Sequence, residues 1–398
     1  MAAALISFDE AIGRLREVAR PRGQEIVPLA AAAGRVLAEP VCAAIRAPAA
    51  DVSTMDGYAV GSADVRKLPA RLAVVAEALP GTLPGGALGP GQCARIFTGA
   101  PLPAGADRVV IQEVVRRAGD RAIVEGPVEE SRFVRAAGSD FEPGDVLVGA
   151  GRPLTPRDLV AAAAGDVAEL IVWRRPVVSL IATGDELVDP GDARSRPGAV
   201  PDSLSAGLAV SVLQWGAELG SRARMSDDLD QLKRIASAAA ANSDLVLVTG
   251  GASVGARDHG REMFGPDLAL IFSKVAIKPG KPVWFGRVGE ALVLGLPGNP
   301  TSAMVTARLF LAPLLAGLCG ADPLAALAWR HAPLGEALGP TGNRETFSRG
   351  RTEGGRVWLL PNQDSGAQRT LAEADLLARR PSGSSGFAAG GLIEMLDF

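Results

Sequence analysis

The chain has 398 residues, of which 47% are hydrophobic and 21% are charged. A chain of this length divides into more than one domain, and this composition excludes an intrinsically disordered protein. The formal net charge of −3 argues against nucleic acid or an anionic membrane as the main partner, because both require a basic surface.

The cysteines and histidines narrow the possible chemistry. Cys42, Cys93 and Cys319 lie far apart and form no CxxC pair, so we expect no disulfide framework, no zinc knuckle and a reducing compartment. His259 and His331 are the only histidines, which argues against histidine-based triads and zinc sites. Catalysis then depends on carboxylates, Lys, Arg, Ser, Thr, backbone amides and a hard cation.

The chain ends and the apolar segments suggest a location. The N-terminus lacks a basic start followed by an apolar run, so no signal peptide is expected. The most apolar helix, near 301–318, is interrupted by Arg308 and Pro313 and is therefore expected to be too short and broken to span a bilayer. We expect a cytoplasmic protein.

The first part of the chain predicts helices followed by short strands. Apolar residues recur with helical spacing over 7–20 and 29–37. From 48 to 142 short β-like runs alternate with Gly/Pro turns, which is typical of a small, mostly-β domain, and a helix follows at 155–164. The runs are 58–60, 72–76, 93–97, 108–112, 122–124 and 131–134.

The next part alternates apolar strands with helices. This rhythm predicts a parallel sheet covered on both faces. The predicted strands are 177–181, 245–248, 269–277 and 291–296, and the predicted helices are 203–217, 229–241 and one beginning at 301. After 323 short strands return (347–349, 357–360 and 392–396), so we expect a C-terminal β domain.

An acidic loop follows the first of these strands. Thr183-Gly184-Asp185-Glu186 places two adjacent carboxylates after a glycine, at the end of a strand. Such a pair suits a hard cation such as Mg²⁺. The alternative is a simple helix N-cap, where Asp and Glu are common.

A glycine-rich loop, 249–255, follows the second strand, and Asp258 comes three residues later. Its glycines, including Gly250 and Gly251, expose backbone amides that can cradle an anion next to Ser253. The loop is neither a Walker A motif nor a GxGxxG fingerprint. Glycines at this point also occur for packing alone.

Two further loops add cations and a helix N-terminus. Lys274 precedes Lys278-Pro279-Gly280-Lys281, where the lysines suit phosphate as point charges, although a solvated surface cluster is the alternative. Pro297-Gly298-Asn299 joins an apolar strand to a helix that opens at 300 or 301. All these loops follow strands, so we expect them along the carboxyl edge of one sheet, as a Mg²⁺-assisted site for a phosphorylated ligand.

These strings together resemble the MoeA/gephyrin E-domain family of molybdopterin molybdenumtransferases. They occur in family order and span most of the chain. The matching strings are Met55-Asp56-Gly57-Tyr58-Ala59-Val60, 95–101, Gly105-Ala106-Asp107, Thr183-Gly184-Asp185-Glu186-Leu187, 250–255, 276–282 and 296–300.

The resemblance implies a multidomain α/β protein with a molybdopterin-binding α/β domain and its parallel-type sheet, an inserted mostly-β domain, an N-terminal helical piece and a C-terminal β-barrel. The expected boundaries are 1–47 with 143–175 for the N-terminal helical and linker domain, 48–142 for the β domain, 176–323 for the α/β domain and 324–398 for the barrel.

The resemblance also implies the reaction and the assembly. The family inserts molybdate into adenylylated molybdopterin with Mg²⁺ and releases AMP. It forms a homodimer in which the β domain of one subunit faces the α/β domain of the other. A molybdopterin adenylyltransferase is a possible further partner, and neither nucleic acid nor membrane is expected.

Carried onto this sequence, the resemblance gives each site residue a role. Asp185 and Glu186 would hold the metal and serve cleavage of the pyrophosphate bond. The other catalytic candidates are Asp56, Asp227 and Asp258. Asp56, together with Thr98 and Asp140, would come from the partner subunit. The substrate-binding candidates are Thr98, Asp140, Thr183, Gly250, Gly251, Ser253, Lys274, Lys278, Lys281, Pro297, Asn299, Arg349 and Ser365.

Several positions depart from the family pattern, among them His259 where an aromatic residue is common, and they keep other functions open. Ala136-Ala137 stands where a second Arg is frequent, Leu204 replaces an Asn, and Ala256 replaces an acidic residue. One alternative is a paralogue that binds molybdopterin without inserting metal. The others are a molybdopterin adenylyltransferase, which resembles the α/β domain alone, and a scaffold, for which long linkers are missing.

Overall fold

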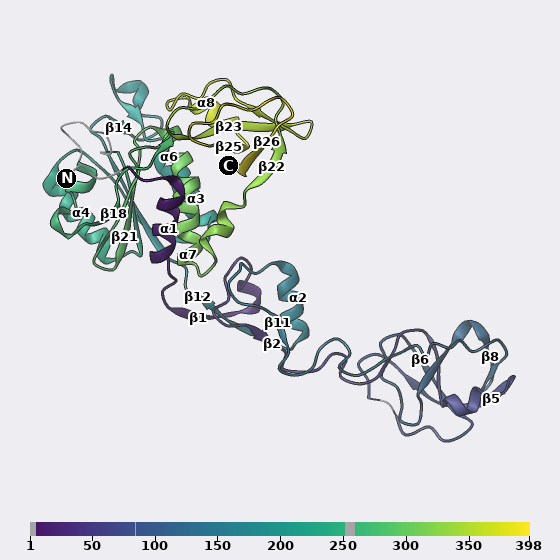
Figure 1. Cartoon of the computed structure of the whole chain (residues 1–398). Helices are drawn as coiled ribbons and strands as arrows, with labels where there is room; N and C mark the ends of the chain where they lie inside the picture. Colours follow the sequence, from purple (N-terminus) through teal and green to yellow (C-terminus); the bar gives the residue numbers. More distant parts are fainter. Residues whose placement is uncertain (1–4, 84, 251–258) are drawn as a thin grey trace.

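The computed structural model describes residues 5–83, 85–250 and 259–398. The molecule is elongated (Figure 1). The α/β domain and the C-terminal strands lie together at one end, a small middle piece follows, and the inserted β domain lies at the opposite end. This arrangement confirms the predicted multidomain α/β fold class.

The central sheet of the α/β domain has six strands. Their order is β16 (Glu218–Met225), β13 (Val177–Thr183), β17 (Leu245–Thr249), β21 (Ala291–Leu296), β20 (Trp284–Val288) and β18 (Ala269–Phe272). The first four are mutually parallel, whereas β20 runs antiparallel to both neighbours. The predicted parallel-type sheet is therefore mixed, with β20 as an antiparallel strand that the sequence did not predict. The cause is the two-residue turn from Val288 to Ala291, where Gly289 has φ 57°, because so short a connection joins only antiparallel strands.

Both faces of this sheet are covered. On β17, Leu245 and Leu247 pack on one face and Val246 and Val248 on the other. The first face is covered by α1 (Phe8–Val18), α3 (Leu204–Gln214), α6 (Pro300–Thr306) and α7 (Ala312–Leu318), and the second by α4 (Leu229–Ala241) and residues near α5 (His259–Glu262). Burial on both faces explains why these strands are continuously apolar.

The first helix belongs to this core. Ser7 caps α1 by accepting a hydrogen bond from the amide of Glu10 at 3.1 Å, and Phe8, Ile12 and Leu15 are buried against the α/β domain. The prediction assigns residues 1–47 to the N-terminal piece, but α1 packs in the core of the α/β domain. Its apolar stripe needs a partner surface, and the helices of the α/β domain supply it.

The middle piece is less helical than predicted. The helix expected at 29–37 is wrong, since only a 3₁₀ turn, Leu29–Ala31, forms there. Gly34 has φ 74°, a conformation that ends helices, and Val36 and Leu37 pair with Pro153 and Val172 instead. The piece contains α2 (Pro156–Ala164) and the strand pairs β1 (Gln24–Pro28) with β12 (Glu169–Trp173) and β2 (Val41–Cys42) with β11 (Val146–Val148).

The inserted domain is the predicted β domain. Its sheet has the order β7 (Arg108–Ile111), β4 (Gly57–Val60), β6 (Gln92–Ile96), β5 (Ala70–Ala78), β9 (Arg121–Val124) and β8 (Val115–Ala118). The short strands β3 (Val52–Ser53) and β10 (Val134–Arg135) pair where the domain joins the middle piece, so the strand expected at 131–134 begins later. Apolar side chains are buried on both faces of the sheet.

The C-terminal strands curl into the predicted barrel. They are β23 (Glu345–Glu353), β24 (Arg356–Leu359), β25 (Leu376–Arg380), β26 (Leu392–Asp397) and β22 (Arg330–Pro333). A bridge from Leu334, beside β22, to Val357 in β24 brings the two ends of the sheet together. Strand β19 (Ile277–Lys278) pairs with β23, so the single strand predicted at 269–277 is divided between two sheets.

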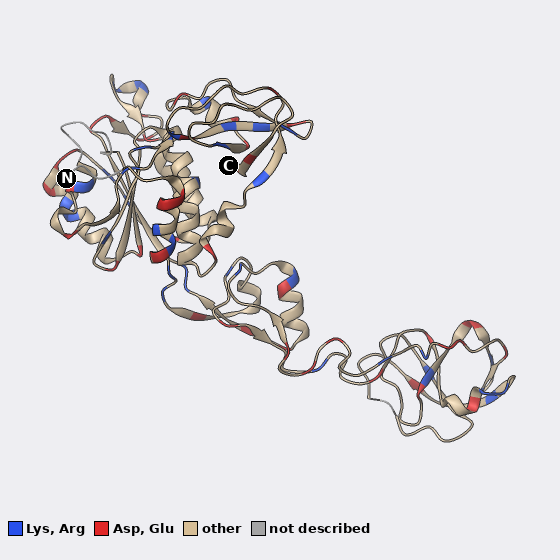
Figure 2. Cartoon of the chain, viewed as in Figure 1, with Lys and Arg blue, Asp and Glu red and all other residues tan. Residues whose placement is uncertain are grey.

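The apolar helix at 300–318 is not broken as predicted. A π-helical segment, Ala307–Leu311, connects α6 to α7, and Pro313 lies in the first turn of α7, where a missing amide is tolerated. By length and composition Pro300–Leu318 could cross a membrane, but 83% of its apolar window is buried inside the molecule, so it is weak evidence for a span. Acidic and basic residues are interspersed through every domain (Figure 2).

The barrel is joined to α1 by Arg379, whose guanidinium pairs with Glu345 and Asp9 and lies 5.3 Å from the ring centroid of Phe8. The Arg379 and Glu345 side chains are only 16% and 14% exposed. Burial raises the pKa of Glu345, and Arg379 opposes that rise. We expect Arg379→Met to lower the free energy of unfolding by about 3 kcal/mol, because it leaves a half-buried carboxylate unpaired. Thermal or urea denaturation measures this loss.

The matched control is Arg369→Met, which removes an arginine that is 94% exposed and paired with Glu373. Its effect is expected below about 0.5 kcal/mol. Equal effects of the two substitutions would show that the Arg379 network contributes nothing beyond a surface ion pair.

Candidate active site

Three loops meet at one edge of the central sheet. They follow β13, β17 and β21, and because these strands are parallel their carboxyl ends lie side by side. A pocket of about 500 Å³ opens between the loops. Its lining is Thr183, Gly184, Glu186, Leu187, Val200, Pro201, Asp202, Ser203, Leu204, Asp227, Thr249, Gly250, Pro282, Pro297, Gly298, Asn299, Pro300 and Gln368.

Glycine is required where the first two loops touch. A Cβ on Gly250 would lie 2.3 Å from the carbonyl oxygen of Thr183, and Gly250 has φ +85°. A Cβ on Gly298 would lie 3.6 Å from Cα of Gly250, so the third loop also approaches closely. The floor of the pocket is therefore backbone packed on backbone.

The acidic residues gather on one side of the pocket. The carboxylate of Glu186 lies over Gly184, where a Cβ would meet its Oε2 at 2.8 Å. Asp185 accepts a hydrogen bond from the amide of Asp227 at 3.0 Å, which ties the acidic loop after β13 to the segment after β16. The structure thus brings together Asp185, Glu186 and Asp227, which are distant in the sequence.

The hydroxyl of Thr183 is buried beneath these loops. Thr183 is 4% exposed, and within the described part of the chain its Oγ1 has no hydrogen-bond partner. The hydroxyl of Thr301, in the first turn of α6, is likewise buried without a described partner. Buried hydroxyls without partners are rare; Thr183 lines the pocket, and Thr301 directly follows the lining residue Pro300.

The lysine turn leaves the sheet at the same edge. β18 and β21 are both antiparallel to β20, so they run in the same direction and the segment after β18 leaves at the same edge. Pro282, at the end of this segment, lines the pocket, whereas the three lysines do not. Lys274 is half-buried, and Lys278 and Lys281 are exposed. Among the described residues, no hydrogen bond or ion pair involves their ammonium groups, which leaves these charges available to an anion. Gly251, Ser253 and Asp258 lie outside the described residues.

The barrel forms one wall of the pocket and is joined to the loop after β21 by a hydrogen bond. Asn299, just before α6, donates from Nδ2 to Oγ of Ser365 at 3.1 Å. Arg349, in contrast, does not line the pocket. It is 1% exposed, and its guanidinium donates to the backbone carbonyls of Asn362, Asp364 and Ala367. The barrel encloses this side chain, so the predicted contact of Arg349 with a ligand stays a prediction.

Comparison with known proteins assigns the family. The family description "MoeA N-terminal region (domain I and II)" matches residues 6–165, "Probable molybdopterin binding domain" matches 179–317, and "MoeA C-terminal region (domain IV)" matches 331–398. The molybdopterin molybdenumtransferase of Synechococcus elongatus is 36% identical over 98% of this chain and 99% of its own length. The chain belongs to the MoeA family.

Further relatives agree with this assignment. A molybdopterin molybdenumtransferase of Nostoc is 38% identical over 81% of this chain and 76% of its own length. A crystal structure of the molybdopterin biosynthesis MoeA protein of Pyrococcus horikoshii superimposes with a TM-score of 0.86 at 27% identity, covering 99% of this chain and 100% of the other. The similarity therefore extends over all parts of the molecule.

The remaining predicted residues lie far from the pocket of their own chain. Asp56 and Thr98 are in the inserted domain, at the opposite end of the MoeA-family molecule (Figure 1). Asp56 accepts hydrogen bonds from the amide and hydroxyl of Thr98, both at 2.8 Å. These bonds lower the pKa of Asp56 below its ordinary value. Asp140 is exposed near the junction of the inserted domain with the middle piece.

We expect Thr98→Val to raise the pKa of Asp56 towards the ordinary value, because one hydrogen bond to the carboxylate is lost. A carboxyl NMR titration measures the shift. A depressed pKa adds stability that is present above the unfolded pKa of about 3.9 and is lost as the pH falls through the lower folded pKa. Thr82→Val, in the same domain, should leave the Asp56 titration unchanged. An unchanged titration in Thr98→Val would contradict the assigned cause.

Several lining residues escaped prediction from the sequence. Asp202, which precedes the N-cap residue Ser203, accepts hydrogen bonds from the amide and hydroxyl of Ser205 in the first turn of α3, a contact that its position before a helix could have signalled. Gln368 comes from the barrel and carried no signal. Leu204, which departs from the family pattern, is 7% exposed and packs into the core, so an apolar side chain fills that position.

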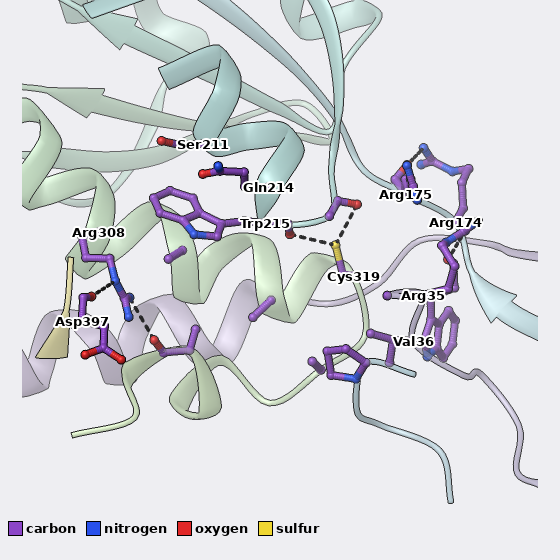
Figure 3. Close-up of a pocket in the computed structure, with 18 of the residues that line it drawn as sticks. Arg35, Val36, Arg174, Arg175, Ser211, Gln214, Trp215, Arg308, Cys319 and Asp397 are labelled. Carbon is purple, nitrogen blue, oxygen red and sulfur yellow. Dashed lines mark hydrogen bonds between the residues drawn. The ribbon is translucent and has the colours of Figure 1, made fainter. Parts of the chain in front are cut away.

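A separate cavity of about 730 Å³ lies where the α/β domain, the middle piece and the C-terminus meet (Figure 3). It contains none of the predicted site residues. Two of its arginines are engaged within the fold: Arg308 donates to the carbonyls of Asp397 and Ala326, and Arg174 pairs with Asp244. Cys319 contacts the carbonyls of Trp215 and Gly216, and burial raises the pKa of its thiol to about 11. We interpret this cavity as a domain junction.

Proposed function

We propose that this chain inserts molybdate into adenylylated molybdopterin and releases AMP. The observation that carries the proposal is the pocket at the sheet edge, which Glu186, Asp227 and Gly250 line together in a chain of the MoeA family. Relatives over nearly its full length are named molybdopterin molybdenumtransferases. Acidic side chains, exposed amides and lysines together suit a ligand that carries phosphates.

Each group of residues has a proposed role that follows from its chemistry. Lys274, Lys278 and Lys281 would bind the phosphate and molybdate oxyanions and stabilise charge that develops when the phosphoanhydride bond to AMP breaks. The carboxylates of Glu186 and Asp227 would orient the reacting groups and accept protons. Ser365 and Asn299 would close the barrel side of the pocket.

Magnesium dependence is part of the proposal. Mg²⁺ is usually held by one or two carboxylates together with substrate phosphates, and Asp185 and Glu186 provide such a pair. In the described ranges no group of three or more His, Cys, Asp or Glu residues could hold a metal by itself, which fits an ion that is completed by the substrate. When bound, the ion would neutralise charge on the phosphoryl oxygens.

A homodimer and a cytoplasmic location complete the proposal. Asp56, Thr98 and Asp140 lie in or beside the inserted domain, far from the pocket of their own chain (Figure 1). An antiparallel pair of elongated subunits would bring the inserted domain of one chain to the pocket of the other. A molybdopterin adenylyltransferase, which supplies the adenylylated substrate, would be the natural partner.

Incubation of the purified protein with adenylylated molybdopterin, molybdate and Mg²⁺ tests the proposal. We expect AMP and a molybdenum-loaded product in equal amounts, and little AMP when Mg²⁺ is chelated. Tight binding without AMP release would instead favour a molybdopterin-binding paralogue, for which the apolar Leu204 is the specific observation. Adenylylation of molybdopterin by ATP would indicate an adenylyltransferase.

A further inference from the structure

A glutamine in the barrel holds the chain beside the pocket. The side-chain oxygen of Gln363 accepts a hydrogen bond from the amide of Arg349 at 2.9 Å. Its Nε2 donates to the carbonyls of Arg349 at 2.8 Å and of Leu360 at 2.7 Å. The amide group therefore uses both ends to fasten the loop after β24 onto β23.

Arg349 holds the same loop from inside the barrel. Its guanidinium donates to the carbonyls of Asn362 at 3.2 Å, Asp364 at 3.0 Å and Ala367 at 3.4 Å. Burial lowers the pKa of Arg349, and no carboxylate forms an ion pair with it in the described ranges. The buried charge is compensated by the loop carbonyls and by the charge of Asp364 in the same loop, which ties the folding of the loop to the arginine.

The loop reaches the pocket at two points. Ser365, at its centre, accepts the hydrogen bond from Asn299 at 3.1 Å. Gln368, which begins α8 (Gln368–Ala372), lines the pocket itself. The backbone between these residues is further ordered by Asp364, whose side chain accepts a hydrogen bond from the amide of Gly366 at 2.8 Å.

We propose that Gln363 and Arg349 are positioning residues that hold the 362–368 loop, and with it Ser365 and Gln368, against the substrate pocket. The proposal rests on the proposed function and adds how the barrel takes part in substrate binding. Neither residue touches the pocket, so both act through the loop. Because the loop forms a wall and carries none of the proposed catalytic carboxylates, it affects the binding of substrate more than the chemical step.

The decisive variant is Gln363→Met, which keeps the length of the side chain and removes its hydrogen bonds. Arg349 is less suitable because its replacement can unfold the barrel. For Gln363→Met we expect KM for adenylylated molybdopterin to rise roughly tenfold while kcat changes less than about twofold, as when uniform binding is lost. Exposed Gln24→Met, on β1 in the middle piece, is the matched control and should match the wild type.

A double-mutant cycle separates positioning from a general loss of stability. If Gln363 acts through Ser365, the increase in KM of the double variant over the wild type should be much smaller than the product of the increases caused by Gln363→Met and Ser365→Ala alone. Hydrogen exchange of the amides at 364, 366 and 368 should become faster in Gln363→Met, with the rest of the barrel unchanged. Independent effects on KM, or an unchanged KM, would overturn the proposal.

Two measurements distinguish a failure of the positioning proposal from a failure of the proposed function. If the wild type releases no AMP, the proposed function fails, and titration with AMP as a probe then decides the role of the loop. Weaker AMP binding by Gln363→Met than by Gln24→Met, together with faster exchange of the loop amides, would support positioning. Equal AMP binding by the two variants would reject it.

Discussion

Replacement of Glu186 by glutamine is expected to reduce AMP release at least about a hundredfold. The substitution keeps the shape of the side chain over Gly184 but removes its negative charge from the pocket. A carboxylate that binds a metal or accepts a proton cannot be replaced in that role by a neutral amide. Initial rates of AMP release from adenylylated molybdopterin, at saturating molybdate and Mg²⁺, measure the effect.

Glu218→Gln is the matched control, because Glu218 is exposed on β16 of the same sheet but at its amino end, away from the pocket. Its rate should stay within about twofold of the wild type, since surface substitutions rarely matter. A Glu186→Gln protein that retains a third or more of the wild-type rate would remove Glu186 from the catalytic residues. The departure at Leu204 would then count more strongly for a binding paralogue.

Replacement of Gly250 by alanine is expected to lower the free energy of unfolding of the α/β domain by about 3 kcal/mol and to abolish most of the activity. The added Cβ would lie 2.3 Å from the carbonyl oxygen of Thr183, and the φ of +85° is strained for alanine. The loops after β13 and β17 must therefore separate, which displaces the adjoining Glu186. Urea denaturation together with the AMP-release assay measures both effects.

Gly298→Ala is the control for a glycine in the same pocket. Its Cβ would lie 3.6 Å from Cα of Gly250, an ordinary contact, and its φ is not in the left-handed region. We expect a change in stability below about 1 kcal/mol. If Gly250→Ala were as stable as Gly298→Ala, the close packing of the loops would not be a requirement of the fold.

The site could be predicted where it depends on strands and the loops directly after them. Continuous apolar runs such as 177–181 and 245–248 indicate strands that are buried on both faces. Parallel strands place their following loops at one edge, so the acidic loop and Gly250 were expected to meet, and they line one pocket. These signals lie within a few residues of each other, and local propensity and burial pattern decide them.

Contacts between distant segments could not be predicted. In the sequence, an arginine that binds a ligand and an arginine that holds a loop look the same. For Arg349, only its enclosure in the barrel distinguishes the two roles. The contact of Asn299 with Ser365 joins positions that are 66 residues apart. The placement of α1 in the α/β core depends on a surface formed by later helices.

The sequence by itself determined the acidic loop, the glycine floor and the lysine turn, because each consists of neighbouring residues after a strand. Tertiary structure alone decided which of these groups share a pocket with the barrel. It also decided that the inserted domain, which carries Asp56, lies at the end of the molecule opposite the pocket (Figure 1). The physical reason is that packing between domains is set by the shapes of complete surfaces, to which residues more than a hundred positions apart contribute.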